Sequence, residues 1–140
     1  MSRTAKAMSR AFDDALAAAG GSLPTWLILV SLKSRTWDTQ RELARALGIE
    51  GPTLTHHLDA LERAGLVTRT RDPANRRVQR MELTEEGDAA FQRMRSAATA
   101  FDRRLRSGLS DGDVRVVREL LGRLRANVSE IHDGGASGTG

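Results

Sequence analysis

The chain has 140 residues, the usual size of one domain, so two large domains are excluded. Hydrophobic residues make up 39% and charged residues 29%, the net charge is +4, and the absence of cysteine excludes disulfides and Cys-ligated zinc. No apolar run approaches the roughly 18 residues that span a bilayer, and no apolar segment follows the basic N-terminus, so we expect a cytoplasmic protein with no membrane partner.

Two helices are predicted in the N-terminal part of the chain. Apolar residues recur at helical spacing until Gly20 and Gly21 stop the pattern, which predicts a first helix at about residues 3–19. Pro24 suits a first helical position, and the apolar run over residues 26–32 predicts a buried second helix.

Two shorter helices with a tight turn between them are predicted next. Thr39 and Glu42 have the spacing of a capping box, which begins a helix that ends at Gly48. Gly51 can cap the following helix, with Pro52 as its first residue, and Gly at residue 65 closes it. Three leucines share one face of this helix, and that face is predicted to be buried: Leu54, Leu58 and Leu61.

The period of the apolar pattern then changes to two, which is typical of strands. Residues 66–71 and 78–83 are predicted strands, and the turn-rich DPANRR at residues 72–77 lies between them, so we expect a β-hairpin with a charged tip. Residues 63–80 contain six arginines and a single acid. This basic stripe is typical of a nucleic-acid contact, and the alternative is a solvated face in an arginine-rich protein.

The C-terminal part is predicted to contain two more helices and a tail. Thr84 is the expected cap of a long helix that keeps one apolar face to about residue 107. Ser110 or Asp111 caps a last helix, whose apolar stripe continues to Ile131. The tail at residues 133–140 has nothing to bury and is predicted to be disordered.

This order of elements predicts a mainly α fold with one small β-hairpin, in which residues 37–87 form a winged helix-turn-helix. The second short helix of such a fold can enter a DNA major groove while the hairpin, or wing, contacts the backbone or the minor groove. With the leucines inward, His56 and Arg63 point away from the core, and a merely solvated helix would favour Glu and Lys there instead. The remaining outward and flanking residues are Thr53, Thr55, His57, Asp59 and Ala60.

Residues 39–87 resemble the winged helix-turn-helix of the MarR (multiple antibiotic resistance regulator) family of bacterial transcription factors. The matching segments are TQRELARALGI, LTHHLDALERAGLVTR and DPANRRVQRMELTEEG, and the flanking helices match in order and length. The resemblance implies one domain over residues 1–132, in which helices at about 3–19 and 88–131 join two copies into a homodimer. It also implies ligand-sensitive repression of nearby genes through a palindromic operator in double-stranded DNA.

The resemblance also assigns roles in the wing. A family wing carries Asp-x-Arg at its tip, where Arg77 matches the arginine that enters the minor groove and Asn75 replaces the bracing Asp. His56 stands where the family often has Arg, so a different base preference is expected. The predicted DNA-binding residues are Thr39, Gln40, Thr53, Thr55, His56, His57, Arg63, Arg71, Asn75, Arg76, Arg77 and Arg80.

An effector pocket is implied by the resemblance, because pockets in the family lie between the winged domain and the dimerisation helices. The sequence identifies no ligand. The alternative is that the candidate residues belong to the ordinary core, since aromatic residues make up only 4% of the chain. The candidates are Phe12, Trp26, Trp37 and Phe91.

Other functions have less support in the sequence. His56 and His57 are adjacent and diverge by about 100° on a helix, and His132 lies near the C-terminus, so no metal site is expected. No phosphate loop or catalytic signature is present, so neither an enzyme nor a cofactor is expected. The remaining alternative is a winged helix that binds protein or RNA without specific DNA binding, and a protein-binding version would be expected to show apolar residues at Thr53, His56 and Ala60.

Overall fold

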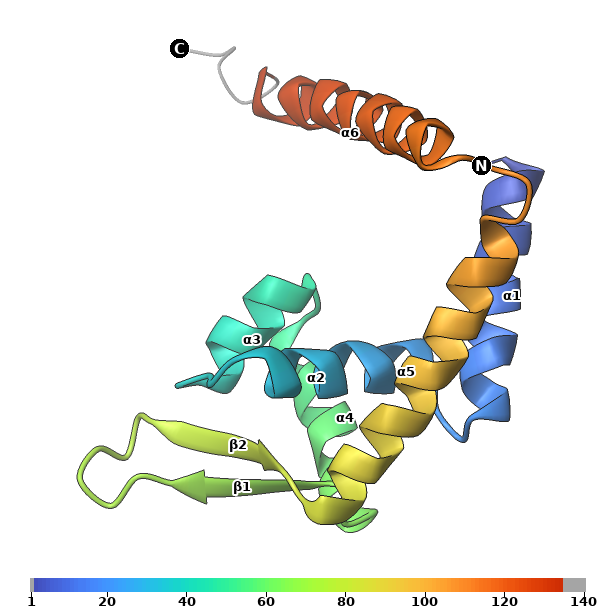
Figure 1. Cartoon of the computed structure of the whole chain (residues 1–140). Coiled ribbons are helices and arrows are strands. Elements are labelled where there is room, and N and C mark those ends of the chain that lie inside the picture. The colour runs from blue at the N-terminus through green and yellow to red at the C-terminus, as the bar shows by residue number, and fades with distance from the viewer. Residues whose placement is uncertain (1, 135–140) are drawn as a thin grey trace. The chain divides into compact units, whose positions relative to one another are not determined.

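The structure is a computed structural model that describes residues 2–134, and the chain forms two compact units, Met1–Phe101 and Asp102–Gly140. Figure 1 shows the elements, and they confirm the predicted mainly α fold with one β-hairpin. Residues 135–140 of the predicted tail lie outside the described residues, while residues 133 and 134 are helical. The elements are α1 (Arg3–Ala18), α2 (Leu23–Ser34), α3 (Gln40–Leu47), α4 (Gly51–Arg63), β1 (Val67–Arg71), β2 (Gln79–Leu83), α5 (Glu85–Leu105) and α6 (Asp111–Gly134).

The helix-turn-helix begins and ends at the signals that the sequence provides. The hydroxyl oxygen of Thr39 accepts a hydrogen bond from the backbone N–H of Glu42 at 3.1 Å, and Gly48 ends α3 with a φ of +67°. The predicted start of α4 was wrong by one residue, because Glu50 is the cap and Gly51 is already helical. Glycine has no Cβ to clash with the ring of Pro52, so it can take helical dihedral angles directly before proline.

The core lies between α1, α2, α3, α4, the hairpin and the first half of α5. The three leucines of α4 are buried as predicted, and they meet apolar side chains from the elements around them. The two strands are antiparallel, with Val67 opposite Leu83 and Arg71 opposite Gln79, and each is one residue shorter than predicted. The largest fully buried side chains are Leu16, Ile28, Leu29, Leu43, Leu54, Leu58, Met94 and Val67.

Both ends of the hairpin are tied to neighbouring segments by hydrogen bonds. The N–H of Gln79 donates to the carbonyl oxygen of Asp38 at 2.8 Å, just before α3. At the other end, the hydroxyl of Thr84 donates to the carbonyl oxygen of Gly65 at 2.6 Å and accepts from the N–H of Gly87 at 3.0 Å. The predicted cap at Thr84 is therefore confirmed, and it joins the hairpin to the start of α5.

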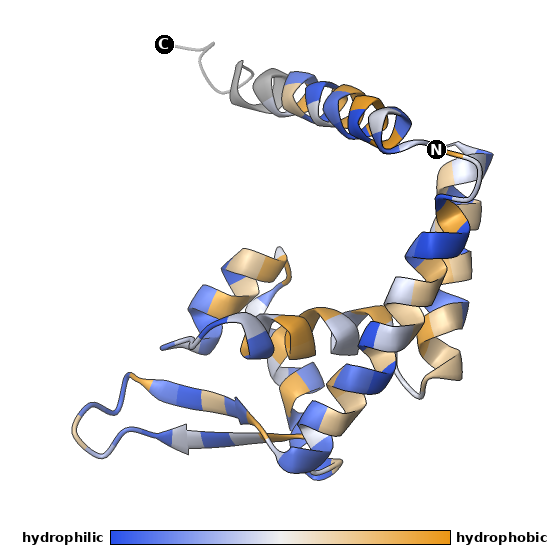
Figure 2. Cartoon of the chain, in the orientation of Figure 1, coloured by the Kyte–Doolittle hydropathy of each residue, from blue (hydrophilic) through white to orange (hydrophobic). Residues whose placement is uncertain are grey.

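Helix α6 begins with a capping box and carries an exposed apolar face. The N–H of Asp113 donates to the hydroxyl oxygen of Ser110 at 3.1 Å, and the N–H of Ser110 donates to a carboxylate oxygen of Asp113 at 2.9 Å. Figure 2 shows apolar bands along the helix. Six of its side chains are 49–61% exposed: Val116, Val117, Leu120, Leu121, Leu124 and Val128.

None of the described helices is long and apolar enough to cross a membrane by itself. Helices α1 and α2 meet the requirements of length and composition only as a pair, and that pair is bent by 72°.

Candidate nucleic-acid interface

The outward face of α4 has the composition that the sequence predicts. Thr53, Thr55, His56 and Arg63 are exposed, and His57 is half-buried. The polar and small side chains leave this helix narrow enough to approach the edges of bases in a major groove. The structure thus places the predicted residues of α4 on the surface, opposite its buried leucines.

Two hydrogen bonds from the backbone to side chains two residues earlier hold the turn at the tip of the wing. One carboxylate oxygen of Asp72 accepts a hydrogen bond from the N–H of Ala74 at 2.9 Å, and the amide oxygen of Asn75 accepts from the N–H of Arg77 at 3.1 Å. Asn75 therefore braces the backbone of the turn. The side chains of Arg76 and Arg77 are exposed beyond it.

Arg69 does not belong to the exposed basic stripe that the sequence suggested. Its side chain is only 13% exposed and pairs with two carboxylates of α4, those of Asp59 and of Glu62, the latter at 3.3 Å from Nε. Burial lowers the pKa of Arg69, but the hydrogen bonds and charges of Glu62 and Asp59 outweigh this effect and raise it above its ordinary value. The free positive charge of the stripe is thus smaller than a count over residues 63–80 indicates.

Gln40 and Thr55, two of the predicted DNA-binding residues, bond to the protein itself. The amide nitrogen of Gln40 donates to the hydroxyl oxygen of Thr55 at 3.1 Å, and its amide oxygen accepts from Arg69 at 3.1 Å. The hydroxyl of Thr55 in turn donates to the carbonyl oxygen of Gly51 at 3.1 Å. These bonds join α3, α4 and β1 at one place.

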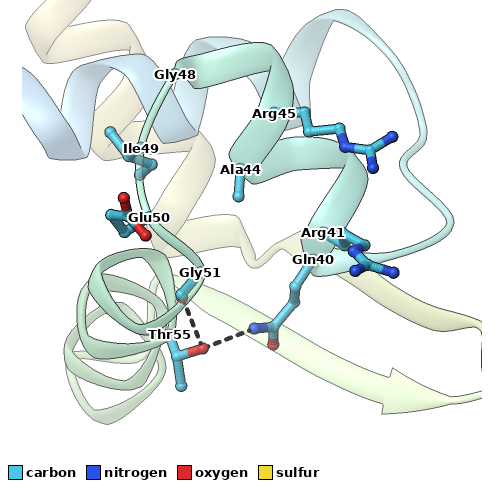
Figure 3. Close-up of a pocket in the computed structure, with 9 residues that line it drawn as sticks. All are labelled: Gln40, Arg41, Ala44, Arg45, Gly48, Ile49, Glu50, Gly51 and Thr55. Atoms are coloured by element: carbon cyan, nitrogen blue, oxygen red, sulfur yellow. Dashed lines mark hydrogen bonds between the residues drawn. The ribbon is translucent and has the colours of Figure 1, made fainter. Parts of the chain in front are cut away.

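A groove of about 690 Å³ lies between α3 and α4. It is lined by two arginines of α3 that are not among the DNA-binding residues predicted from the sequence. Figure 3 shows Gln40 reaching toward Thr55 across the groove, while Arg41 and Arg45 extend away from α4. Both arginines are exposed and lie one helical turn apart. Arg41 lies within the capping box and Arg45 four residues later, and this i, i+4 spacing on one face of α3 was the signal in the sequence that could have identified them.

The remaining predicted residues of the interface are exposed or lie at the start of α3. Arg71 and Arg80 are exposed on the two strands of the wing, and Thr39 is the half-buried cap of α3. The wing arginines and the outward face of α4 therefore belong to the same compact unit.

The four aromatic candidates for an effector pocket are not gathered into one cavity. Trp26 stacks on Phe91, with ring centroids 5.7 Å apart, whereas Phe12 packs against Phe101 at 5.1 Å. Trp37 is buried in the same core as Phe91, where its indole N–H donates to the carbonyl oxygen of Ser31 at 2.8 Å. Neither the groove nor a second cavity of about 330 Å³ beside β2 is lined by any of the four.

The two histidines of α4 are neighbours whose rings are tilted against each other. The rings of His56 and His57 have centroids 5.8 Å apart and planes inclined by 59°. Within the described part of the chain, no group of three or more potential metal-ligating side chains comes together. The side chain of His132 lies outside the described ones.

Comparison with known proteins identifies the family. The MarR family model matches residues 22–78. The crystal structure of transcriptional regulator PA3341 shares 32% sequence identity and a TM-score of 0.74, over 91% of this chain and 94% of that one. The transcriptional repressor CouR bound to a 23-mer DNA duplex shares 30% identity and a TM-score of 0.75, over 91% and 87%. CouR from Rhodococcus jostii RHA1 bound to p-coumaroyl-CoA shares 28% identity and a TM-score of 0.73, over 87% and 86%. This chain belongs to the MarR family of transcriptional regulators.

Proposed function

We propose that the protein is a homodimeric repressor that binds a palindromic operator next to the genes it regulates. The observation that carries this proposal is the single compact unit in which an exposed polar face of α4 adjoins a hairpin with exposed arginines at its tip. The relative CouR is a repressor that has been solved on a DNA duplex. The proposed place of action is the cytoplasm, where chromosomal DNA is accessible.

Helix α4 and the wing contact different parts of the DNA in this proposal. Helix α4 enters the major groove, where His56 meets base edges while Thr53 and Arg63 lie toward the phosphates. The wing places Arg77 in the minor groove, and Arg71, Arg76 and Arg80 supply charge along the backbone. The groove arginines of α3 add two further phosphate contacts.

A second copy of the chain is the proposed cover for the apolar face of α6. The six apolar side chains of that face are each about half exposed or more, which is unfavourable in water at about 25 cal/mol per Å² of apolar surface. The exposed side chain of Met8 on α1 is proposed to be covered by the second copy as well. In the dimer, residues 1–132 would act as one domain, and its two copies of α4 would face two half-sites.

Release from DNA by a small-molecule effector is the remaining part of the proposal. CouR has been solved with p-coumaroyl-CoA, so at least one relative accommodates an acyl-CoA thioester. None of the four aromatic candidates lines either of the two cavities, so they identify no effector chemistry.

Selection of bound fragments from genomic DNA tests the proposal. The full chain is mixed with fragmented DNA, and the retained fragments are sequenced. We expect enrichment of a short palindrome whose half-sites lie about 10–10.5 bp apart, because two copies of α4 must meet successive major grooves on one face of the duplex. Retention of RNA, or of DNA without any sequence preference, would contradict the proposal.

A further inference from the structure

Arg69 on β1 occupies a junction between the wing and both helices of the helix-turn-helix. Its guanidinium bonds to Asp59 and Glu62 on α4 and to Gln40 on α3, where the Nη1–Oε1 distance to Gln40 is 3.1 Å. Gln40 continues the connection to Thr55 on α4 at 3.1 Å. One side chain therefore links three elements that are separate in the sequence.

The geometry of this junction restricts how the linked elements can move. A guanidinium is planar and presents its N–H donors in fixed directions, so its partners must keep their relative positions for all the bonds to form. The side chain of Arg69 is only 13% exposed, whereas the carboxylates of Asp59 and Glu62 remain nearly half exposed, so the guanidinium is enclosed by its partners on the protein side. Within the winged unit, these bonds add to the apolar core between α4 and β1, to which Leu58, Leu61 and Val67 contribute.

We infer that Arg69 is a positioning residue, which holds α4 and the wing at the relative angle that an operator requires, and that it is not a phosphate contact. The inference rests on the proposed DNA binding. Asp59 and Glu62 already carry two negative charges against its one positive charge, so the cluster as a whole offers phosphates no net attraction.

Positioning and simple attraction have different consequences for binding. Phosphates line every duplex, so the wing and α4 can reach them even when their relative angle varies. Base edges and a narrow minor groove must be met at the same time, and this requires a fixed angle between the two elements. Loss of the junction should therefore reduce the preference for the operator more than the affinity for DNA in general.

The test compares two variants that break the same pairing but change the charge in opposite directions. Arg69→Gln removes a positive charge, whereas Asp59→Asn removes a negative one. We expect both to lower the ratio of operator to scrambled-duplex affinity, by about tenfold, a change common when bonded neighbours are uncoupled. The double variant Arg69→Gln/Asp59→Asn should lower the ratio by no more than the larger single effect, because the two residues act through one contact.

Arg71→Gln is the matched control, since it removes the same charge from an exposed position two residues along the same strand. It should weaken operator and scrambled duplexes alike and reduce the salt dependence of both. The inference is overturned if Arg69→Gln behaves in the same way, or if Asp59→Asn tightens binding to both duplexes as a purely electrostatic effect requires.

Two further measurements keep the outcomes distinct. If the wild-type chain shows no preference for any duplex, the proposed function fails and not the role of Arg69. Hydrogen exchange without DNA then still tests the junction, because Arg69→Gln should speed exchange at the amides of the β1–β2 hairpin and Arg71→Gln should not.

Glu62→Gln serves as the second variant if Arg69→Gln does not fold, and it too must lower the operator preference.

Discussion

The carbonyl oxygen of Leu66 occupies the space where a side chain on Gly87 would begin. A Cβ built on Gly87 would lie 1.9 Å from that oxygen and 2.9 Å from its carbon. The same oxygen accepts a hydrogen bond from the N–H of Thr84 at 3.0 Å. The first turn of α5 is therefore packed directly on the backbone that leads into β1, and only glycine permits this approach.

Gly87→Ala should destabilise the winged unit. The atoms that the new methyl group meets are backbone atoms held by a hydrogen bond, so they cannot move aside as a flexible side chain would. We expect a loss of about 1–3 kcal/mol, or more, in the free energy of unfolding. Urea denaturation followed by circular dichroism measures it.

Gly112→Ala is the matched control for this prediction. Gly112 also lies in the first turn of a helix, but a Cβ there would meet only the hydroxyl oxygen of Ser110, at 3.7 Å. The change is expected to be neutral or to stabilise by up to about 1 kcal/mol, because glycine is unfavourable within helices. Equal midpoints of urea unfolding for Gly87→Ala and Gly112→Ala would contradict the steric role of Gly87.

Local signals in the sequence predicted most of the fold. The capping box at Thr39 and Glu42 and the terminator Gly48 act within one or two turns, so they can be read without knowledge of distant residues. The one-residue error at α4 arose because Gly51 was read as a cap although glycine before proline can be helical.

Long-range pairing accounts for what the sequence did not predict at the site. Arg69 was counted as part of an exposed stripe because Asp59 and Glu62 precede that stripe in the sequence and pair with it only after folding. The aromatic candidates show the same limit, since periodicity identifies apolar positions but not which of them meet: Trp26 stacks on Phe91, and Phe12 packs on Phe101.

Loss of the apolar face of α6 should convert the proposed dimer into monomers. In the double variant Leu120→Asp/Leu124→Asp, two carboxylates would have to be buried in the interface without partners, which is strongly unfavourable. Sedimentation should give the monomer mass for this variant, and for a chain ended after Ser110. Arg123→Gln, an exposed change on the same helix, should remain dimeric. A truncated chain that still sediments as a stable dimer would contradict the proposal that α6 forms the dimer interface.

Salt should weaken operator binding steeply. Two wings and two copies of α4 are expected to neutralise on the order of 8–12 phosphates, which gives a slope of log K against log salt of roughly −7 to −11. Fluorescence anisotropy with an operator duplex over a range of salt concentrations measures the slope. A value shallower than about −3 would indicate recognition of a protein or a small molecule instead.

Replacement of His56 and of Arg77 by alanine should change DNA binding in different ways. His56 is exposed on the outward face of α4, where it is expected to contact base edges, so His56→Ala should cost about 1–3 kcal/mol per half-site on the operator and little on scrambled DNA. Arg77→Ala should weaken both duplexes and flatten the salt slope by roughly one unit per wing, because it removes a contact to the charged groove.

Measurement of both variants on operator and scrambled duplexes, each at two salt concentrations, separates these effects. The backbone of the wing tip stays braced in Arg77→Ala, since the amide oxygen of Asn75 bonds to the N–H of residue 77 and not to its side chain. A loss in that variant therefore reports the guanidinium itself. If His56→Ala weakens the two duplexes equally, His56 is a phosphate contact and the outward face of α4 does not read bases through it.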